Sequence, residues 1–269
     1  MGRLDGAIAV VTGGTQGLGA EVARLFAERG AAGLVICGRN AAKGTAVADA
    51  IEADFRTPVA FVEVDLADVG ACRSVIACAR NRFGRVDVLA NIAAITDRGT
   101  ILDTDPDLFD RIMAVNVRAP FFLMQEAVKL MRETKVEGSI VNVSSVSSHA
   151  GQPFIAAYCA SKGALDTLTR NTAYALLNNR IRVNALNIGW MASEGEKTIQ
   201  QRYHGAGEDW LDRAGAHLPN GRLVDPKEVA RAIAFLASAE SGLMTGACVE
   251  FDQSVRGAFD SQPMPDAPL

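Results

Sequence analysis

Short runs of apolar residues alternate along this chain with longer segments in which apolar positions recur every three or four residues. Apolar runs of about 4 to 8 residues are typical of strands, and the longer recurrence is typical of helices that bury one face. The predicted strands are Ala7–Val11, Leu34–Cys37, Val59–Val64, Val86–Ala90, Ser139–Val143, Arg182–Leu186 and Ala247–Phe251. The predicted helices are roughly Leu18–Arg29, Ala41–Ala53, Gly70–Phe83, Pro106–Thr134, Ala157–Leu177 and Pro226–Ser238. Strands and helices therefore alternate along the whole chain.

These strands indicate a sheet that is buried on both faces. Strands with one exposed face alternate apolar and polar residues, whereas these runs are apolar nearly throughout, as in parallel sheets covered by helices. Right-handed crossovers place such helices in two outer layers. We therefore predict an α/β fold, a doubly wound parallel sheet of about seven strands with helices on both faces, as a single domain over residues 1–260 of the 269.

Two segments depart from this alternation. Residues 189–223 are polar and rich in glycine, and they follow a predicted strand end, where doubly wound sheets bind their ligands. We predict that this segment is a substrate lid. Residues 261–269 contain three prolines and are predicted to be a tail outside the packed core.

Composition and charge narrow the range of partners. The net charge is only −4 and the basic residues are scattered, which argues against a nucleic-acid or anionic-membrane surface. The five cysteines form no Cys-x-x-Cys pair, and with three histidines they support no metal site. The first apolar run ends too soon for a signal peptide or a membrane span, so a cytoplasmic protein with a small-molecule substrate is predicted.

A glycine-rich turn joins the first predicted strand to the first helix. It reads Thr12-Gly13-Gly14-Thr15-Gln16-Gly17-Leu18-Gly19. Glycines let the backbone approach a pyrophosphate, and the free N–H groups at the start of a helix attract its charge. The turn is either such a nucleotide site or an ordinary glycine-rich connection, and its place between first strand and helix favours nucleotide binding.

The end of the second strand bears on which nucleotide is bound. An acidic residue there would hydrogen-bond the ribose hydroxyls of NAD, whereas an arginine accommodates the 2′-phosphate of NADP. The sequence has Gly38-Arg39-Asn40, which favours NADP over NAD. Asp65, after the third strand, either contacts the adenine edge or caps the following helix.

Three residues supply candidate chemistry near the fifth predicted strand. Ser145 follows that strand, and Tyr158 and Lys162 stand four residues apart on the next helix, hence on one face. Reduction of a ketone needs a donor to polarise the carbonyl and an acid to protonate the developing alkoxide, roles that Ser145 and Tyr158 can fill. A nearby ammonium favours the phenolate, so we expect Lys162 to lower the pKa of Tyr158.

With these motifs the sequence resembles the short-chain dehydrogenases/reductases in their compact single-domain branch, over about residues 4–258. The resemblance implies a Rossmann-like fold, NAD(P), catalytic Ser145, Tyr158 and Lys162, and a homotetramer built on the two long helices. It also implies that Asn116 holds a water linking the lysine to solvent. Two motifs depart from the family: Asn91-Ile92-Ala93-Ala94 replaces Asn-Asn-Ala-Gly, and Ile188-Gly189 replaces Pro-Gly. The predicted cofactor contacts are Gly13, Thr15, Gln16, Gly17, Leu18, Gly19, Arg39, Asn40, Asp65, Leu66, Asn91, Ala93, Tyr158, Lys162, Ile188, Gly189 and Met191.

The predicted function is therefore interconversion of a secondary alcohol and a ketone by hydride transfer. The polar predicted lid, with Glu194, Glu196 and Asp209, favours a polyol, sugar or other small hydroxylated substrate. One alternative is a ketoacyl-carrier-protein reductase, which would need a basic patch such as Arg118, Arg170 and Arg180 could form. The other alternative is a cofactor-binding sensor without redox chemistry.

Overall fold

Parallel strands form one seven-stranded sheet in the computed structural model, which describes residues 3–149 and 151–254. Their order across the sheet is β3-β2-β1-β4-β5-β6-β7, so the direction of winding reverses between β1 and β4. The strands are β1 (Ile8–Thr12), β2 (Gly33–Gly38), β3 (Val59–Glu63), β4 (Val88–Asn91), β5 (Ser139–Ser145), β6 (Arg182–Ile188) and β7 (Cys248–Phe251). The predicted α/β doubly wound fold is confirmed.

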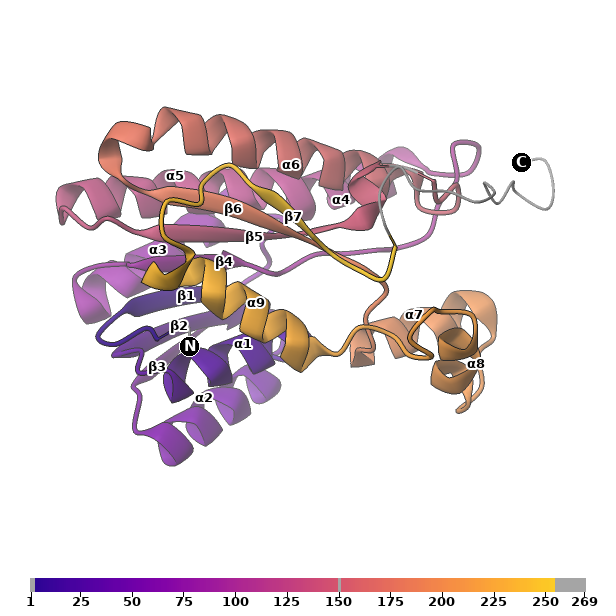
Figure 1. Cartoon of the computed structure of the whole chain (residues 1–269), viewed down its shortest axis with the longest axis horizontal. Helices are drawn as coiled ribbons and strands as arrows, with labels where there is room; N and C mark the ends of the chain where they lie inside the picture. The colour runs from indigo at the N-terminus through magenta and orange to yellow at the C-terminus, as the bar shows by residue number, and fades with distance from the viewer. Residues whose placement is uncertain (1–2, 150, 255–269) are drawn as a thin grey trace.

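Helices cover both faces of the sheet (Figure 1). They are α1 (Gly17–Glu28), α2 (Ala41–Phe55), α3 (Val69–Phe83), α4 (Pro106–Met113), α5 (Ala119–Glu133), α6 (Ala156–Ala175), α7 (Glu194–His204), α8 (Trp210–Ala216) and α9 (Pro226–Ala237). Helices α1, α2 and α9 pack on one face around buried Phe26, Ile51 and Ile233. Helices α3 and α5 pack on the other face around buried Ile76 and Leu130. Two apolar cores therefore enclose the sheet.

Local sequence explains where several helices begin. The side chains of Asn40, Asp68 and Asp105 each accept a hydrogen bond from a backbone N–H in the first turn of α2, α3 and α4. Helix α9 begins with a capping box in which Asp225 and Glu228 each bond the other's backbone. Asp68, and not Asp65, is therefore the residue that caps α3.

The helix predicted over Pro106–Thr134 is helical from Pro106 to Glu133, but a π-helical turn at Ala114–Arg118 divides it into α4 and α5. The N–H of Ala119 bonds to the carbonyl of Ala114, five residues earlier. Pro120 lies one residue further on and has no N–H to donate to the Asn116 carbonyl, as an α-helix requires. The wider turn accommodates that missing donor, and Asn116 lies at its centre.

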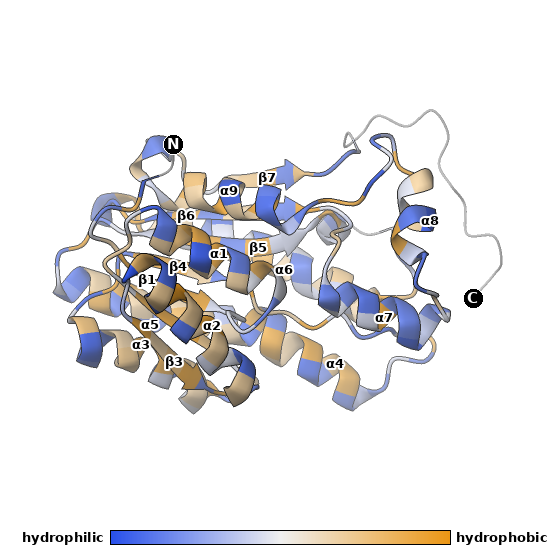
Figure 2. Ribbon diagram, turned by 90° about the horizontal axis from the view of Figure 1, so that it is seen from below, coloured by the Kyte–Doolittle hydropathy of each residue, from blue (hydrophilic) through white to orange (hydrophobic). Residues whose placement is uncertain are grey.

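The predicted lid segment, residues 189–223, contains two helices that the sequence pattern did not reveal. Helix α7 is largely hydrophilic (Figure 2), which explains why no apolar periodicity marks it. Helix α8 is held by a small cluster of its own, formed by Trp210, Ala214 and Leu223. Figure 1 shows α7 and α8 beyond the ends of the strands. We call residues 189–223 the α7–α8 segment. The predicted tail, residues 261–269, lies outside the described residues.

Candidate active site

The carboxyl ends of the strands meet two adjoining hollows. One is a cavity of about 560 Å³ whose lining includes Ser145, Tyr158 and Lys162. The other is a cleft of about 290 Å³ whose lining includes the turn from Gly13 to Gly19. Leu18 and Met191 line both, so the two hollows share a wall. A ligand that spans them would place one end on the glycine turn and the other beside Tyr158.

The glycine turn is a cradle that larger residues would fill. Gly13 has a φ of +69°, and a Cβ on Gly19 would stand 2.2 Å from the Gly13 carbonyl oxygen. The Thr12 hydroxyl accepts hydrogen bonds from the N–H groups of Ile92 (2.8 Å) and Ala93 (3.1 Å), which ties the turn to the end of β4. The turn therefore has the form and the free helix terminus that a dinucleotide pyrophosphate requires, so a nicotinamide dinucleotide fits these residues.

Cations line the far end of the cleft. Arg39 and Arg111 both contribute to its lining, and the Lys43 ammonium donates a 2.7 Å hydrogen bond to the Gln16 side chain. Lys43 was not predicted as a site residue, although its position one turn beyond Arg39 could have indicated it. Asp65 also lines the cleft and pairs with Arg111 at 3.1 Å. The backbone N–H of Ala67 and the Arg111 guanidinium hold the pKa of Asp65 below its ordinary value.

Most of the predicted cofactor residues do line these hollows, and two have other contacts. The cleft is lined by Gly13, Thr15, Gln16, Gly17, Leu18, Gly19, Arg39, Asp65, Leu66, Ala93 and Met191, and the larger cavity by Tyr158, Lys162, Ile188 and Gly189. Asn40 caps α2. The Asn91 amide donates a 2.8 Å hydrogen bond to Asn142, and so joins β4 to β5. The side chains of Asn40 and Asn91 therefore act on the protein itself.

Ser145 is the last residue of β5 and is fixed by the turn that follows it. Its hydroxyl accepts from the Ser147 N–H and donates to the Ser147 hydroxyl, each at 3.1 Å. It also hydrogen-bonds Tyr158, an interaction that lowers the pKa of that phenol. The sheet register pairs Ser145 with Ile188, so β5 and β6 both run two residues further than predicted. This extension brings Ser145 to the cavity.

Burial dominates the acid–base properties of Tyr158 and Lys162 on α6. It raises the pKa of Tyr158 to about 12, and the hydrogen bond from Ser145 offsets only part of that shift. The ammonium of Lys162 lies 5.5 Å from the Tyr158 ring centroid and donates a 2.8 Å hydrogen bond to the Val143 carbonyl. We expected a lowered Tyr158 pKa; in this structure the net shift is upward instead, because the low-dielectric surroundings disfavour the phenolate.

Lys162 is itself strongly perturbed. Burial lowers its pKa to about 8, and the carboxylate of Asp166, one helical turn away, opposes that shift. Asp166 is buried, and its Oδ2 accepts a 3.1 Å hydrogen bond from Asn187. The sequence analysis did not identify Asp166, though its spacing of four residues from Lys162 on the same helix could have done so.

The Asn116 side chain is fully engaged with protein groups. Its amide donates to the Ile95 carbonyl (3.0 Å) and to the Ser161 hydroxyl (3.1 Å), and its oxygen accepts from the Ile95 N–H (2.9 Å). Both amide hydrogens are thus used. If Asn116 holds a water, its backbone carbonyl in the π-helical turn is the group that can accept from it.

Residues that the sequence did not single out complete the larger cavity. Arg98 and Gln152 come from the loops after β4 and β5, and Gln200 comes from α7. His149 lies near this cavity in the chain but hydrogen-bonds Glu250 at 2.7 Å.

The arginines proposed as a carrier-protein patch are separated. Arg180 lies two residues before β6, at the amino end of the sheet, and pairs with Glu137. Arg118 lies in the π-helical turn, where it donates to the Ala67 carbonyl at 2.7 Å. Arg118 and Arg180 therefore have separate partners, and the three arginines do not form one patch beside the cavity.

Two further observations concern residues 3–149 and 151–254. Within these ranges no three His, Cys, Asp or Glu side chains gather in a way that could hold a metal ion. No helix in the same ranges has the length and apolar character needed to cross a membrane.

Comparison with known proteins places the chain among oxidoreductases. A family model described as "Enoyl-(Acyl carrier protein) reductase" matches residues 13–254. Trans-4-hydroxycyclohexanecarboxylate dehydrogenase of Sinomonas cyclohexanicum is 34% identical, over 93% of this chain and 93% of that protein. Galactitol 2-dehydrogenase of Agrobacterium fabrum is 30% identical, over 89% of this chain and 93% of that protein. Among solved structures, L-sorbose reductase from Gluconobacter frateurii, complexed with NADPH and L-sorbose, superposes with a TM-score of 0.88, at 25% identity over 96% of this chain and 99% of that one.

The buried ammonium yields a prediction about stability. Because the pKa of Lys162 is about 8 in the folded chain and ordinarily 10.5, the fold must carry a desolvated charge below pH 8. That penalty vanishes as the pH rises from 8 to 10.5. We expect Lys162→Met to lose activity yet to raise the free energy of unfolding at pH 7 by about 1 to 3 kcal/mol, even after loss of the Val143 hydrogen bond. The gain should shrink toward pH 10.

Urea titrations at pH 7 and pH 10, at equal protein concentration, measure both effects. Lys227→Met, at an exposed position, is the control and should change little at either pH. A Lys162→Met protein less stable than the wild type at both pH values would contradict the prediction.

Proposed function

The chain belongs to the short-chain dehydrogenase/reductase family, and we propose that it interconverts a secondary alcohol and a ketone with Tyr158 as its acid–base residue. The observation that carries this proposal is that Ser145, Tyr158 and Lys162 line one cavity that adjoins the glycine cradle. When bound, the nicotinamide cofactor supplies or accepts the hydride. The alternative of a sensor without redox chemistry gives no reason for this complete set of groups.

The side chains divide the chemistry among them. Ser145 is held by Ser147 so that its hydroxyl can polarise the carbonyl oxygen of the substrate. The raised pKa of Tyr158 keeps its phenol protonated at neutral pH, which is the form that donates a proton to the developing alkoxide. Lys162 would hold the nicotinamide ribose, and a water at the Asn116 carbonyl would carry the proton onward from its ammonium.

The substrate class and the lid are part of this proposal. The cavity walls include Ser147, Gln152 and Gln200 beside the reacting groups, and such hydrogen-bonding walls suit a small hydroxylated molecule. Galactitol and L-sorbose, named for two of the relatives, are molecules of this class. The α7–α8 segment lines the same cavity through Glu196 and His204, which supports its role as a lid.

Among the cofactors we propose NADP(H). Arg39 lines the cleft, and Lys43 stands nearby on the first turn of α2, bonded to Gln16. Two cations at the end of β2 complement a 2′-phosphate. NADPH is also the cofactor bound in the sorbose reductase structure.

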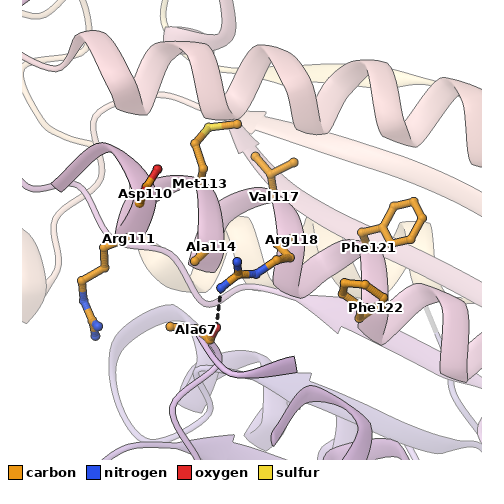
Figure 3. A pocket seen from close by; sticks show the side chains of 9 residues that line it. All are labelled: Ala67, Asp110, Arg111, Met113, Ala114, Val117, Arg118, Phe121 and Phe122. Carbon is orange, nitrogen blue, oxygen red and sulfur yellow. Dashed lines mark hydrogen bonds between the residues drawn. The ribbon is translucent and has the colours of Figure 1, made fainter. Parts of the chain in front are cut away.

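A homotetramer in the cytoplasm completes the proposal. Helices α4, α5 and α6 expose Phe109, Phe121 and Tyr174, apolar side chains that a second copy would cover. Figure 3 shows the groove of about 590 Å³ on this side, walled by Met113, Val117 and Phe121. All five cysteines are free thiols, which supports a reducing compartment.

Replacing Tyr158 tests the reaction directly. Tyr158→Phe removes only the hydroxyl, so we expect kcat to fall by about 10²- to 10⁴-fold while the affinity for NADPH stays within about twofold. The rate of NADPH consumption at saturating substrate measures kcat, and a fluorescence titration with NADPH measures the affinity for the cofactor. Tyr174→Phe, at a residue that is 80% exposed, is the matched control. A Tyr158→Phe enzyme with wild-type turnover would exclude Tyr158 as the acid–base residue.

Replacing Arg39 tests the cofactor assignment. Arg39→Ala should raise KM for NADPH by about tenfold or more, because a charge-assisted bond contributes about 1.5 to 3 kcal/mol, and should leave KM for NADH nearly unchanged. Arg24→Ala, which removes a surface arginine paired with Asp54, is the control. A wild-type preference for NADH would overturn the NADP assignment.

The mass in solution tests the assembly. We expect light scattering to give the mass of four 28.4 kDa chains. Phe121→Asp should lower that mass by placing a charge in the proposed contact. Leu243→Asp, at a residue that is 98% exposed outside these helices, should not lower it. A wild-type protein with the mass of one chain would rule out the tetramer.

A further inference from the structure

We propose that Arg98 and Glu196 are specificity-determining residues that restrict the cavity to uncharged, polyhydroxylated substrates. This inference rests on the proposed alcohol–ketone interconversion and deepens it. Arg98 lies in the loop after β4 and Glu196 in the first turn of α7. Their charged groups stand 3.7 Å apart, and both side chains line the same cavity as Ser145 and Tyr158.

Both side chains are held in place and shielded from solvent. Oε1 of Glu196 accepts hydrogen bonds from the Trp190 indole (2.9 Å) and the Gln200 amide (2.7 Å). The Arg98 guanidinium lies 5.3 Å from the centroid of the Phe154 ring. The side chains are only 14% and 17% exposed, so each charge would be costly without the other. Such fixed groups can discriminate between substrates because they do not move aside at little cost.

The pair also lies near the reacting atoms. The charge of Glu196 raises the pKa of Tyr158 and the charge of Arg98 lowers it, although burial and the Ser145 hydrogen bond act more strongly. The two charges therefore act on the Tyr158 hydroxyl in opposite directions. A substrate that reaches from Tyr158 toward α7 would meet both.

The charges of Arg98 and Glu196 decide which substrates this wall of the cavity accepts. A carboxylate-bearing substrate would meet Glu196 at short range, and a cationic one would meet Arg98. An apolar chain would cover both groups and offer no hydrogen bonds in return. Hydroxyl groups can donate to the carboxylate and accept from the guanidinium, so a neutral chain of hydroxyls satisfies both. The wall thus favours a polyol or its ketose over an acid or an alkyl alcohol.

A second role for the pair has to be separated from this one. Arg98 also donates to the His204 ring at 3.4 Å, so the pair helps to fasten α7 to the loop after β4. That loop has another attachment to α7, in which the Tyr203 hydroxyl donates to Asp97 at 3.2 Å. If the pair only fastened α7, breaking either attachment would impair every substrate alike.

The experiment compares three alcohols of one chain length with NADP⁺: galactitol, its carboxylate analogue galactonate, and 2-hexanol. We expect the wild type to have the highest kcat/KM on galactitol. Glu196→Gln keeps the size of the side chain and leaves the charge of Arg98 uncompensated. It should raise KM for galactitol about tenfold with kcat within about threefold, and should raise the kcat/KM ratio of galactonate to galactitol by about tenfold or more.

Two variants serve as controls. Glu194→Gln removes an exposed carboxylate two residues away in the same turn of α7 and should leave all three substrates unchanged. Tyr203→Phe weakens the other attachment, in which Arg202 also pairs with Asp97 at 3.7 Å, and should not change the ratio of galactonate to galactitol.

Three outcomes would overturn the inference. A wild type that prefers galactonate or 2-hexanol excludes selection of neutral polyols while leaving hydride transfer intact. A Glu196→Gln enzyme that loses activity equally on all three, as Tyr203→Phe does, assigns the pair to fastening α7. No turnover of any of the three by the wild type would overturn the proposed function together with this inference.

Discussion

Burial of the sheet on both faces is the constraint on which the rest of this molecule depends. Apolar helices cover each face, so a polar group on a strand finds partners most readily where the strand ends. The winding reverses between β1 and β4, and there the connections leave in opposite directions and open the hollows. Thr12, at the end of β1, bonds the backbone just beyond β4 and thereby fixes the glycine turn against the cavity. The position of the site thus follows from the topology before any catalytic side chain is considered.

The same burial sets the electrostatics of the proposed catalytic groups. Tyr158 and Lys162 are shifted in opposite directions, the phenol toward a pKa of about 12 and the ammonium toward about 8. In both cases the neutral form is favoured, as a low dielectric demands. Asp166 opposes the shift of Lys162, and it is itself oriented by Asn187. A fold selected for stability alone would have no reason to bury this set of groups, which is consistent with a site maintained for chemistry at some cost in stability.

The sequence was sufficient for the features that depend on local pattern. Strand and helix periodicity predicted the fold class, and residue spacing placed Ser145, Tyr158 and Lys162 on one cavity. The sequence was insufficient for features that are set by contacts between distant residues. The π-helical turn follows from Pro120 together with the hydrogen bonds between Asn116 and Ile95. The sequence shows the proline, but it does not show those hydrogen bonds. Helix α7 is hydrophilic and has no buried residue, so periodicity could not reveal it. The direction of the Tyr158 shift depends on how deeply the ring is buried, which spacing does not report.

The proposed reaction and the proposed selectivity therefore reside in physically different parts of the chain. Ser145 and the backbone partner of Lys162, Val143, belong to β5, a central strand whose register is fixed on both sides. Arg98 belongs to the loop after β4 and Glu196 to α7, and both of these segments lie outside the sheet. Changes in β5 would disturb the two cores and the chemistry together, whereas changes in the loop or in α7 alter mainly what the cavity holds. Because the helix has no buried residue, its contribution to folding is small, and its sequence is free to follow the substrate. This separation explains how the strand ends can keep the same reaction while changes in the loop after β4 or in α7 alter the substrate.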